Sequence, residues 1–300
     1  RALFSLGRPA DETRLVEGLI RHRVNVATIK GRLPDPAFAL DDIPPQTAVI
    51  LQGGGALGAF ECGVVKALEE AQIFPDIVAG VSIGAFNGAI IASNPRHANE
   101  ALEAFWEDLS VAAVPLPFAC GERAAAAMQI LTFGVPRFFT PRWMPSLSTL
   151  PDILASWTSF YDTGPMRDLI AKYVYFLALK TSPVRLLMSA VNVTTAELEI
   201  FDSYVDDLTA DHVVASGSLP PGFPWTTIDG KAYWDGGIVS NSPLDLVNER
   251  CGPDGKRVFI VDLFSGQSPL PANMMEVLLR RDEIVYSERV LFPVRTYRTV

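Results

Sequence analysis

Two glycine-rich turns, each directly after a short apolar run, contain the residues of this chain that could do chemistry. The second turn is Gly80-Val81-Ser82-Ile83-Gly84, which has the spacing of a nucleophile elbow. In an elbow the serine sits on a tight turn from strand to helix, and glycines two residues before and after it relieve the crowding. The pattern predicts Ser82 as a nucleophile with Gly80 and Gly84 as its motif glycines. The alternative interpretation is a serine that caps a helix.

The first turn, Gly53-Gly54-Gly55-Ala56-Leu57-Gly58, has the composition of an anion-binding loop. Glycines at a helix start present unhindered backbone N–H groups, where a negative charge is favoured. Beside a nucleophile, such groups can form the oxyanion hole of an acyl-transfer site. We expect Gly54 and Gly55 to be the main donors. The full set of residues expected to build the hole is Gly53, Gly54, Gly55, Ala56, Gly58 and Ile83.

The same glycines also match the fingerprint of dinucleotide-binding proteins. Such a site needs an acidic residue at the end of the second strand to hold the ribose. The nearby acid, Asp76, lies at the start of that strand, and Ser82 stands at its end. A dinucleotide-binding oxidoreductase is therefore the less favoured alternative, as is a turn that only lets the helix pack on the sheet.

A serine nucleophile needs a base, and the chain has three histidines. His22 lies ahead of the predicted core and His97 follows a helix break, so His212 is the only candidate for a triad. It stands on a predicted short helix, where a solvated histidine is the simpler interpretation.

A carboxylate is the other candidate base. Asp235 follows two aromatic residues that can exclude water, and Gly236 and Gly237 after it permit close approach of another backbone or a substrate. Exclusion of water raises the pKa of a carboxyl group toward the range of a general base. The same residues also fit an Asp-Gly hairpin turn, and the local sequence does not separate the two.

Strands alternate with helices from residue 47 onward, which predicts a parallel sheet covered by helices. The two glycine turns start 80 − 53 = 27 residues apart, the length of one βαβ unit, so both should lie at the same edge of the sheet. Strands are predicted over residues 48–52, 77–81, 184–193, 197–201, 257–263 and 293–300. Helices are predicted over 13–22, 59–71, 83–92, 98–108, 124–131, 164–173, 207–215, 244–248 and 273–290.

The chain divides into an expected N-terminal extension, residues 1–46, and one domain, residues 47–300. Within the domain, residues 110–165 form an insertion in which aromatic residues alternate with prolines. This insertion is either a local satellite core or an acyl-chain pocket or lid.

Composition narrows the class of protein. Of 300 residues, 49% are hydrophobic and 20% charged, enough to bury a sizeable core, and the net charge of −9 argues against a nucleic-acid partner. The cysteines, Cys62, Cys120 and Cys251, are too scattered for a disulfide framework or, with the histidines, for a zinc site. Without a visible signal peptide or a run of 18 apolar residues, we expect a cytoplasmic location.

The glycine loop, the GxSxG motif and the distant Asp-Gly-Gly together resemble the patatin-like phospholipase family over about residues 47–263. The resemblance implies a Ser-Asp dyad without histidine, in which Ser82 is the nucleophile and Asp235 its partner. It also assigns the oxyanion loop to residues 53–58, and residues 215–221 resemble a turn that lies near the active site in this family.

The resemblance further implies a three-layer α/β/α fold with a mostly parallel central sheet. The implied activity is that of a serine acyl hydrolase acting on lipid or acyl esters through an acyl-enzyme, with no metal and no cofactor. The expected partners are the substrate and, transiently, a membrane surface; the oligomeric state is left open. Many members carry an acid before the glycines and a base within the loop, but this chain has Gln52 and Leu57 there, so no preference for anionic head groups is expected. The non-enzymatic alternative is a catalytically silent lipid-binding module.

Overall fold

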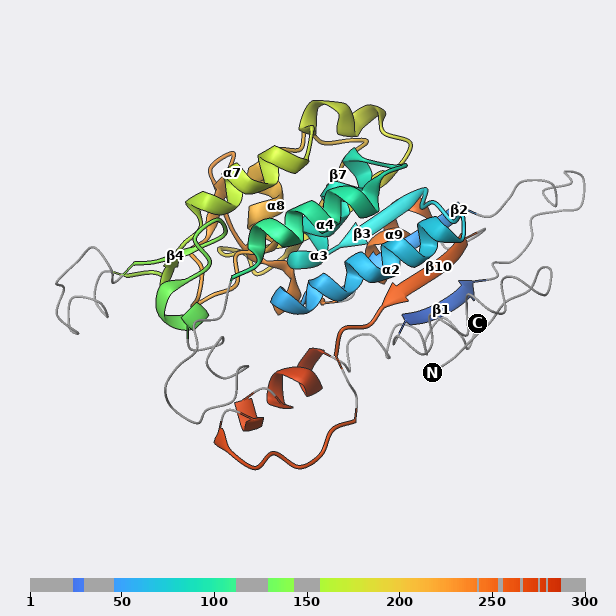
Figure 1. The fold of residues 1–300 in the computed structure, drawn as a ribbon. Helices are drawn as coiled ribbons and strands as arrows, with labels where there is room; N and C mark the ends of the chain where they lie inside the picture. Colours follow the sequence, from blue (N-terminus) through green and yellow to red (C-terminus); the bar gives the residue numbers. More distant parts are fainter. Residues whose placement is uncertain are drawn as a thin grey trace, which may run out of the picture.

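A twisted sheet runs through the centre of the protein in the computed structural model (Figure 1). The structure describes residues 24–29, 46–111, 129–142, 157–241, 243–252, 256–264, 267–274, 276–278 and 280–286. The strands of the main sheet are β1 (Val24–Ile29), β2 (Gln46–Leu51), β3 (Ile77–Gly80), β6 (Arg185–Asn192), β7 (Leu198–Asp202), β8 (Thr226–Ile228), β9 (Lys231–Asp235) and β10 (Lys256–Val261). Their order is β1-β10-β2-β3-β6-β9-β8, with β7 also paired to β6.

Helices follow the strands as the alternation predicts. They are α2 (Ala59–Glu70), α3 (Ile83–Ser93), α4 (Ala98–Leu109), α7 (Gly164–Tyr173), α8 (Ala210–Ser216) and α9 (Leu244–Cys251), with the short 3-10 segments η2 (Gly55–Gly58), η3 (Phe176–Thr181) and η4 (Gly236–Ile238). Two short strands, β4 (Thr140–Pro141) and β5 (Tyr161–Asp162), pair separately. Among the described residues, no helix combines the length and the apolar character needed to cross a bilayer.

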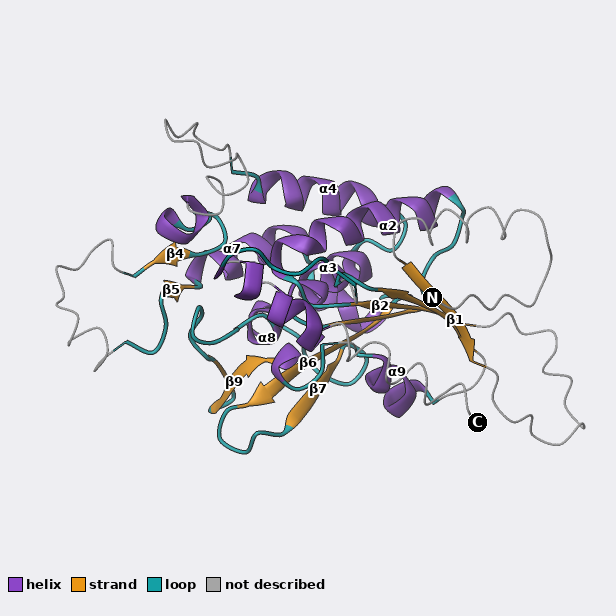
Figure 2. Ribbon diagram, turned by 90° about the horizontal axis from the view of Figure 1, so that it is seen from below, coloured by secondary structure: helices purple, strands orange, loops and turns teal. Residues whose placement is uncertain are grey.

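Side chains alternate between the two faces of the sheet, and each face has its own helix layer. From β2, Val49 and Leu51 join a large apolar cluster with α2, α3, α4, α7 and α8, while Ala48 and Ile50 join a smaller one with α9. Figure 2 shows α2, α3 and α4 on one side of the sheet and α9 on the other. The four central strands, β10, β2, β3 and β6, are parallel. The predicted three-layer α/β/α fold with a parallel centre is therefore confirmed.

Helix α3 is buried along most of its length because its side chains are apolar and small. Residues 83–92 are all buried. A Cβ atom at Gly88 would lie 3.1 Å from side-chain atoms of Leu186 and Val78, so this glycine lets the helix lie close to the sheet. The helix that follows Ser82 is therefore packed tightly against the sheet.

Strands β3 and β9 meet end to end on one edge of β6. At Leu187 and Met188, β6 pairs with β3 on one side and β7 on the other; at Ala190 and Val191, it pairs with β7 and β9. Strands β3 and β9 therefore share the edge opposite β7. Because β3 is parallel to β6 and β9 is antiparallel to it, their carboxyl ends face each other.

Several elements differ from the sequence predictions. The predictions did not include β1, β8 or β9. Strand β1 lies within the segment 1–46 and pairs antiparallel with β10. The predicted helix 13–22 and strand 293–300 lie outside the described residues, as does most of the predicted helix 124–131; the described part of the predicted helix 273–290 is helical between Met274 and Tyr286.

Candidate active site

Ser82 stands on a sharp turn between β3 and α3. Its backbone has φ 55° and ψ −127°, a strained conformation that a non-glycine residue rarely adopts. The chain crosses itself closely here, since a Cβ atom at Gly80 would lie 2.1 Å from the carbonyl oxygen of Gly84. A Cβ atom at Gly84 would in turn lie 2.4 Å from the carbonyl oxygen of Leu51. Only glycines permit this turn, which presents the serine beyond the end of the strand.

Asp235 is the last residue of β9, whose carboxyl end faces that of β3, and it lies against Ser82. Asp235 pairs with Ala190 of β6, and Gly80, at the end of β3, pairs with Met188 of β6. Ala190 and Met188 are two positions apart, which is about 7 Å along the strand. Asp235 is 2% exposed, and its carboxyl group lies close enough to the Ser82 side chain for that side chain to lower its pKa. It also accepts a hydrogen bond from the backbone N–H of Gly237 at 2.7 Å.

The surroundings of Asp235 change its acidity. Burial raises the pKa of this carboxyl group to about 7, because the charged form loses hydration; the nearby Ser82 side chain and the hydrogen bond from Gly237 oppose the shift. A carboxyl group with this pKa exchanges its proton near neutral pH, as a general base must.

The glycines after Asp235 allow β9 to turn beside β6. A Cβ atom at Gly236 would lie 2.5 Å from the carbonyl oxygen of Ser189, and one at Gly237 would lie 2.8 Å from Oδ1 of Asn241. The alternative of an Asp-Gly hairpin is not what the structure contains, since Asp235 ends a strand and the glycines begin η4.

The first glycine turn lies beside the same two strand ends. A Cβ atom at Gly53 would lie 2.9 Å from Cβ of Ser82, so the turn and the serine are in contact. Gly55, at φ 57°, is exposed, as is Ala56, whereas Gly58 is buried at the end of η2.

Free backbone donors gather in this turn. Within the described residues, the N–H groups of Gly53, Gly54, Gly55 and Ile83 donate to no acceptor, whereas that of Leu57 donates to the carbonyl of Gly54. The turn therefore offers unpaired donors next to the serine.

Three side chains that the sequence analysis did not assign support this arrangement. Asn241 donates to the carbonyl oxygen of Gly53 at 3.0 Å, and the hydroxyl group of Ser216 accepts a hydrogen bond from the Ser82 backbone N–H at 3.0 Å. Gln52 binds the backbone of Leu263 and Tyr286, so it connects the start of the glycine turn to β10 and the C-terminal helix. Ser216 lies within residues 215–221, the segment that resembles a turn near the active site in this family. No local sequence signal marks Asn241 or Gln52 as a site residue.

His212 has a structural partner of its own. Its Nδ1 accepts a hydrogen bond from the backbone N–H of Thr209 at 3.1 Å in the capping box of α8, and its ring packs edge-on against Phe201. Burial lowers the pKa of this imidazole. His97 is exposed at the start of α4, and His22 lies outside the described residues. No group of metal-ligating side chains occurs in the described parts of the chain.

The described part of the aromatic insertion packs on the core. Phe138 contacts Phe86 of α3 with ring centroids 5.2 Å apart, and Phe139 contacts Tyr161 and Phe223 at 4.8 and 5.3 Å. Residues 112–128 and 143–156 lie outside the described residues, so this packing concerns 129–142 and 157–165.

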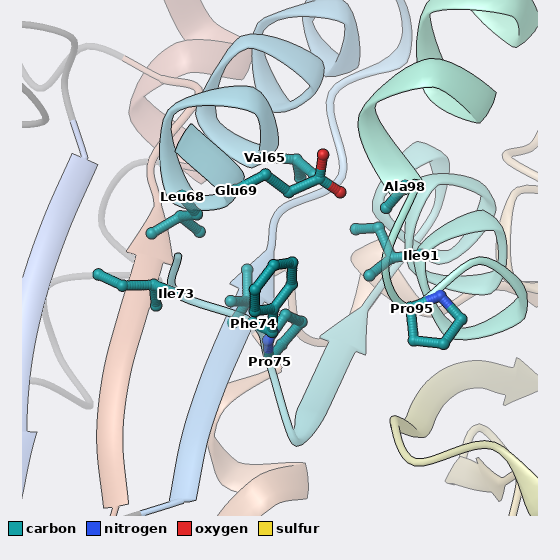
Figure 3. Close-up of a pocket in the computed structure, with 10 residues that line it drawn as sticks. Val65, Leu68, Glu69, Ile73, Phe74, Pro75, Ile91, Pro95 and Ala98 are labelled. Atoms are coloured by element: carbon teal, nitrogen blue, oxygen red, sulfur yellow. The ribbon is translucent and has the colours of Figure 1, made fainter. Parts of the chain in front are cut away.

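A small cavity lies at the opposite end of β3 from Ser82 (Figure 3). Its lining includes Ile73, Phe74 and Pro75, which precede the strand, together with Val65 and Leu68 of α2. Its volume of about 10 Å³ has room for about one water molecule. The cavity therefore has neither the size nor the position to hold an acyl chain for reaction at Ser82.

Comparisons with known proteins identify relatives of this chain. Patatin-like phospholipase domain-containing protein 6 from mouse is 31% identical over 273 residues, which cover 88% of this chain and 16% of that protein. Lysophospholipase NTE1 from Meyerozyma guilliermondii is 26% identical over 231 residues, which cover 77% of this chain and 13% of that protein. Lysophospholipase nte1 from Aspergillus terreus is 61% identical over 44 residues, or 15% of this chain and 3% of that protein.

These relatives are much longer proteins, of which this chain spans 16% or less. Among solved structures, VipD from Legionella pneumophila matches 66% of this chain and 47% of its own at 16% identity, with a TM-score of 0.36, too low to add to the argument. Residues 49–247 match the family model for patatin-like phospholipase. With both glycine turns and the Asp-Gly-Gly segment inside that match, the chain belongs to the patatin-like phospholipase family.

Proposed function

We propose that this domain is a serine hydrolase that cleaves acyl esters of lipids, with Ser82 as the nucleophile and Asp235 as its base. The observation that carries the proposal is the placement, against the Ser82 side chain, of a buried carboxyl group whose pKa is raised to about 7. The unpaired amides of the glycine turn beside this pair support it. Family membership points to the same chemistry.

The proposed reaction proceeds through an acyl-enzyme. Oγ of Ser82 attacks the ester carbonyl carbon while Asp235 accepts the hydroxyl proton. The carbonyl oxygen becomes an oxyanion that accepts hydrogen bonds from Gly54, Gly55 and Ile83. As the intermediate collapses, Asp235 returns the proton to the leaving alcohol, and Ser82 keeps the acyl group.

Water then completes the cycle. Asp235 takes a proton from a water molecule that attacks the acyl carbonyl, and as the second intermediate collapses to the fatty acid, Asp235 returns this proton to Oγ of Ser82. These steps use no metal or cofactor, so activity should be retained after treatment with EDTA.

We propose a lysophospholipid as the first substrate class to test, because two of the relatives are named lysophospholipases. The loop carries Gln52 and Leu57 and no basic side chain, which favours zwitterionic or neutral head groups over anionic ones. Apolar side chains next to the site, Leu57, Leu219, Ile238 and Val239, are 37–48% exposed and would favour transient contact with a lipid aggregate.

The test compares three variants against a nitrophenyl ester and lysophosphatidylcholine. Ser82→Ala and Asp235→Asn should each lower kcat by at least about 1000-fold, while the matched control His212→Ala should remain within about threefold of the wild type. A fluorophosphonate should label the wild type and leave Ser82→Ala unlabelled. Near-normal turnover by either dyad variant would reject its role, and an unlabelled, inactive wild type would favour a silent lipid-binding module.

A further inference from the structure

A second buried carboxyl group lies directly beneath the glycine turn. Glu61, in the first turn of α2, has an exposed fraction of 0%. Its Oε2 accepts a hydrogen bond from Nδ2 of Asn87 at 2.7 Å. Its Oε1 has no hydrogen-bond partner among the described residues, and the backbone of Gln52, the residue before the triple glycine, lies near enough to the carboxyl group to lower its pKa. No step of the proposed reaction uses this acid.

Asn87 extends the contact to the far end of the turn. It lies on α3, five residues after Ser82, and its Nδ2 also donates to the carbonyl oxygen of Gly58 at 3.0 Å. Its Oδ1 accepts a hydrogen bond from Nε1 of Trp106 on α4 at 3.2 Å. The Glu61–Asn87 pair therefore joins the Gly58 end of the turn to the helix that begins at the serine, and Glu61 also lies near the backbone of Gln52 at the other end.

The charge state of Glu61 fits this position. Burial raises the pKa of the carboxyl group to about 8, although the hydrogen bond from Asn87 opposes the shift. The group is therefore mostly neutral at pH 7. A neutral group can hold the turn without repelling a negative charge that develops above it, whereas a carboxylate at the same place would oppose that charge.

We propose that Glu61 and Asn87 are positioning residues that fix the distance between the amides of the glycine turn and the hydroxyl group of Ser82. This inference rests on the proposed function. Donors in an oxyanion hole act on a charge that exists only in the transition state, so their misplacement lowers kcat and leaves substrate binding nearly unchanged. If these residues only filled the core, their substitution would instead lower stability and leave kcat per folded molecule unchanged.

The test measures kcat, KM and thermal stability for variants that separate these outcomes. Glu61→Leu should lower kcat by about tenfold or more with KM within about twofold of the wild type. Glu61→Gln retains an acceptor for Asn87 and should stay within about threefold. Asn87→Leu should resemble Glu61→Leu, and the double variant should be no slower than either single one, because the two side chains act as a unit.

A matched control removes packing without touching the turn. Leu68, 2% exposed, lies at the other end of α2, so Leu68→Ala should destabilise the fold while leaving kcat per labelled site unchanged. Titration with a fluorophosphonate counts folded, reactive molecules in every sample. If Glu61→Leu does not fold, Trp106→Phe, which deletes the hydrogen bond to Asn87 together with the part of the indole ring beside Gly58, should still lower kcat with an unchanged KM.

An unchanged kcat per labelled site in Glu61→Leu, or in Trp106→Phe where the first variant does not fold, would overturn this inference. So would equal losses in Glu61→Gln and Glu61→Leu. The proposed function fails differently, through an active Ser82→Ala or an unreactive wild type, so the two failures are distinguishable.

Discussion

At the residue scale, Gly53 leaves no room for a side chain in the glycine turn. A Cβ atom there would lie 2.5 Å from Oδ1 of Asn241 and 2.9 Å from Cβ of Ser82. Gly53→Ala should therefore push the turn away from the serine, and a displacement of about 1 Å lowers kcat by about 100-fold. The measurement is kcat per fluorophosphonate-reactive site.

Gly63 provides the control for this substitution. It lies in α2, and a Cβ atom there would meet nothing within 4 Å. Gly63→Ala should keep the wild-type rate and stabilise the protein by about 0.5–1 kcal/mol, since alanine loses less conformational entropy in a helix. Equal kcat values for Gly53→Ala and Gly63→Ala would contradict the claim that a side chain at position 53 displaces the glycine turn.

The pH dependence of the reaction follows from Asp235. The base must be ionised to accept the serine proton, and burial raises its pKa to about 7. The value of kcat/KM should therefore rise with pH through about 7 and fall again as Glu61 ionises at about 8. Initial rates with a nitrophenyl ester between pH 5.5 and about 8.5, corrected for spontaneous hydrolysis, would check this, and a flat profile between pH 6 and 8 would contradict it.

At the element scale, the site depends on strands β3 and β9, and the sequence predicted only β3. Strand β3 is apolar, precedes an elbow motif and follows the first turn by one βαβ unit, so its place could be predicted. Strand β9 contains Lys231 and Asp235 within five residues and is bounded by Asp-Gly pairs, which resemble turns. Its position follows from pairing with β6, a contact that local patterns do not encode.

Strand β1 was missed for a related reason. Its six residues lie in a segment broken by prolines, and they form a strand through pairing with β10, about 230 residues later in the chain. The proposed domain boundary at residue 46 can be tested with a chain that begins there.

Removal of residues 1–45 should weaken the fold and leave the site intact. The truncated chain loses the six residue pairs between β1 and β10 and exposes the edge of β10. Exposed strand edges promote association, so melting temperature should fall and light scattering should rise. Because Ser82 and Asp235 lie two strands or more away from β10, kcat per labelled site should not change. A loss of labelling in folded, truncated protein would place part of the site in the removed segment.

At the scale of the whole molecule, the predicted family and fold class are confirmed, because they rest on the order and spacing of apolar runs and glycine turns. The side chains that support the site were harder to predict. Asn241, Ser216 and Glu61 are ordinary polar residues in sequence, and only the fold places them beside the glycine turn and the serine. The roles of Ser82 and Asp235 stay predictions until the variants are measured.

Two buried carboxyl groups make the stability of the whole protein depend on pH. The pKa values of Asp235 and Glu61 are raised to about 7 and about 8 in the folded state, from 3.8 and 4.5 as ordinary values. Between those limits the unfolded chain is ionised while the folded protein keeps both protons. Each pH unit then costs about 1.4 kcal/mol per group, so stability falls as pH rises and levels off above about 8.

The melting temperature should therefore fall by several degrees between pH 6 and about 8.5. Asp235→Asn and Glu61→Gln should each raise it relative to the wild type, by more at the higher pH, because an amide has no proton to lose. Asp168→Asn is the control, since it removes one carboxylate from the exposed face of α7. If all three variants melt in parallel with the wild type across this range, the two acids ionise normally in the folded protein, and Asp235 would lack the acidity that the proposed reaction requires.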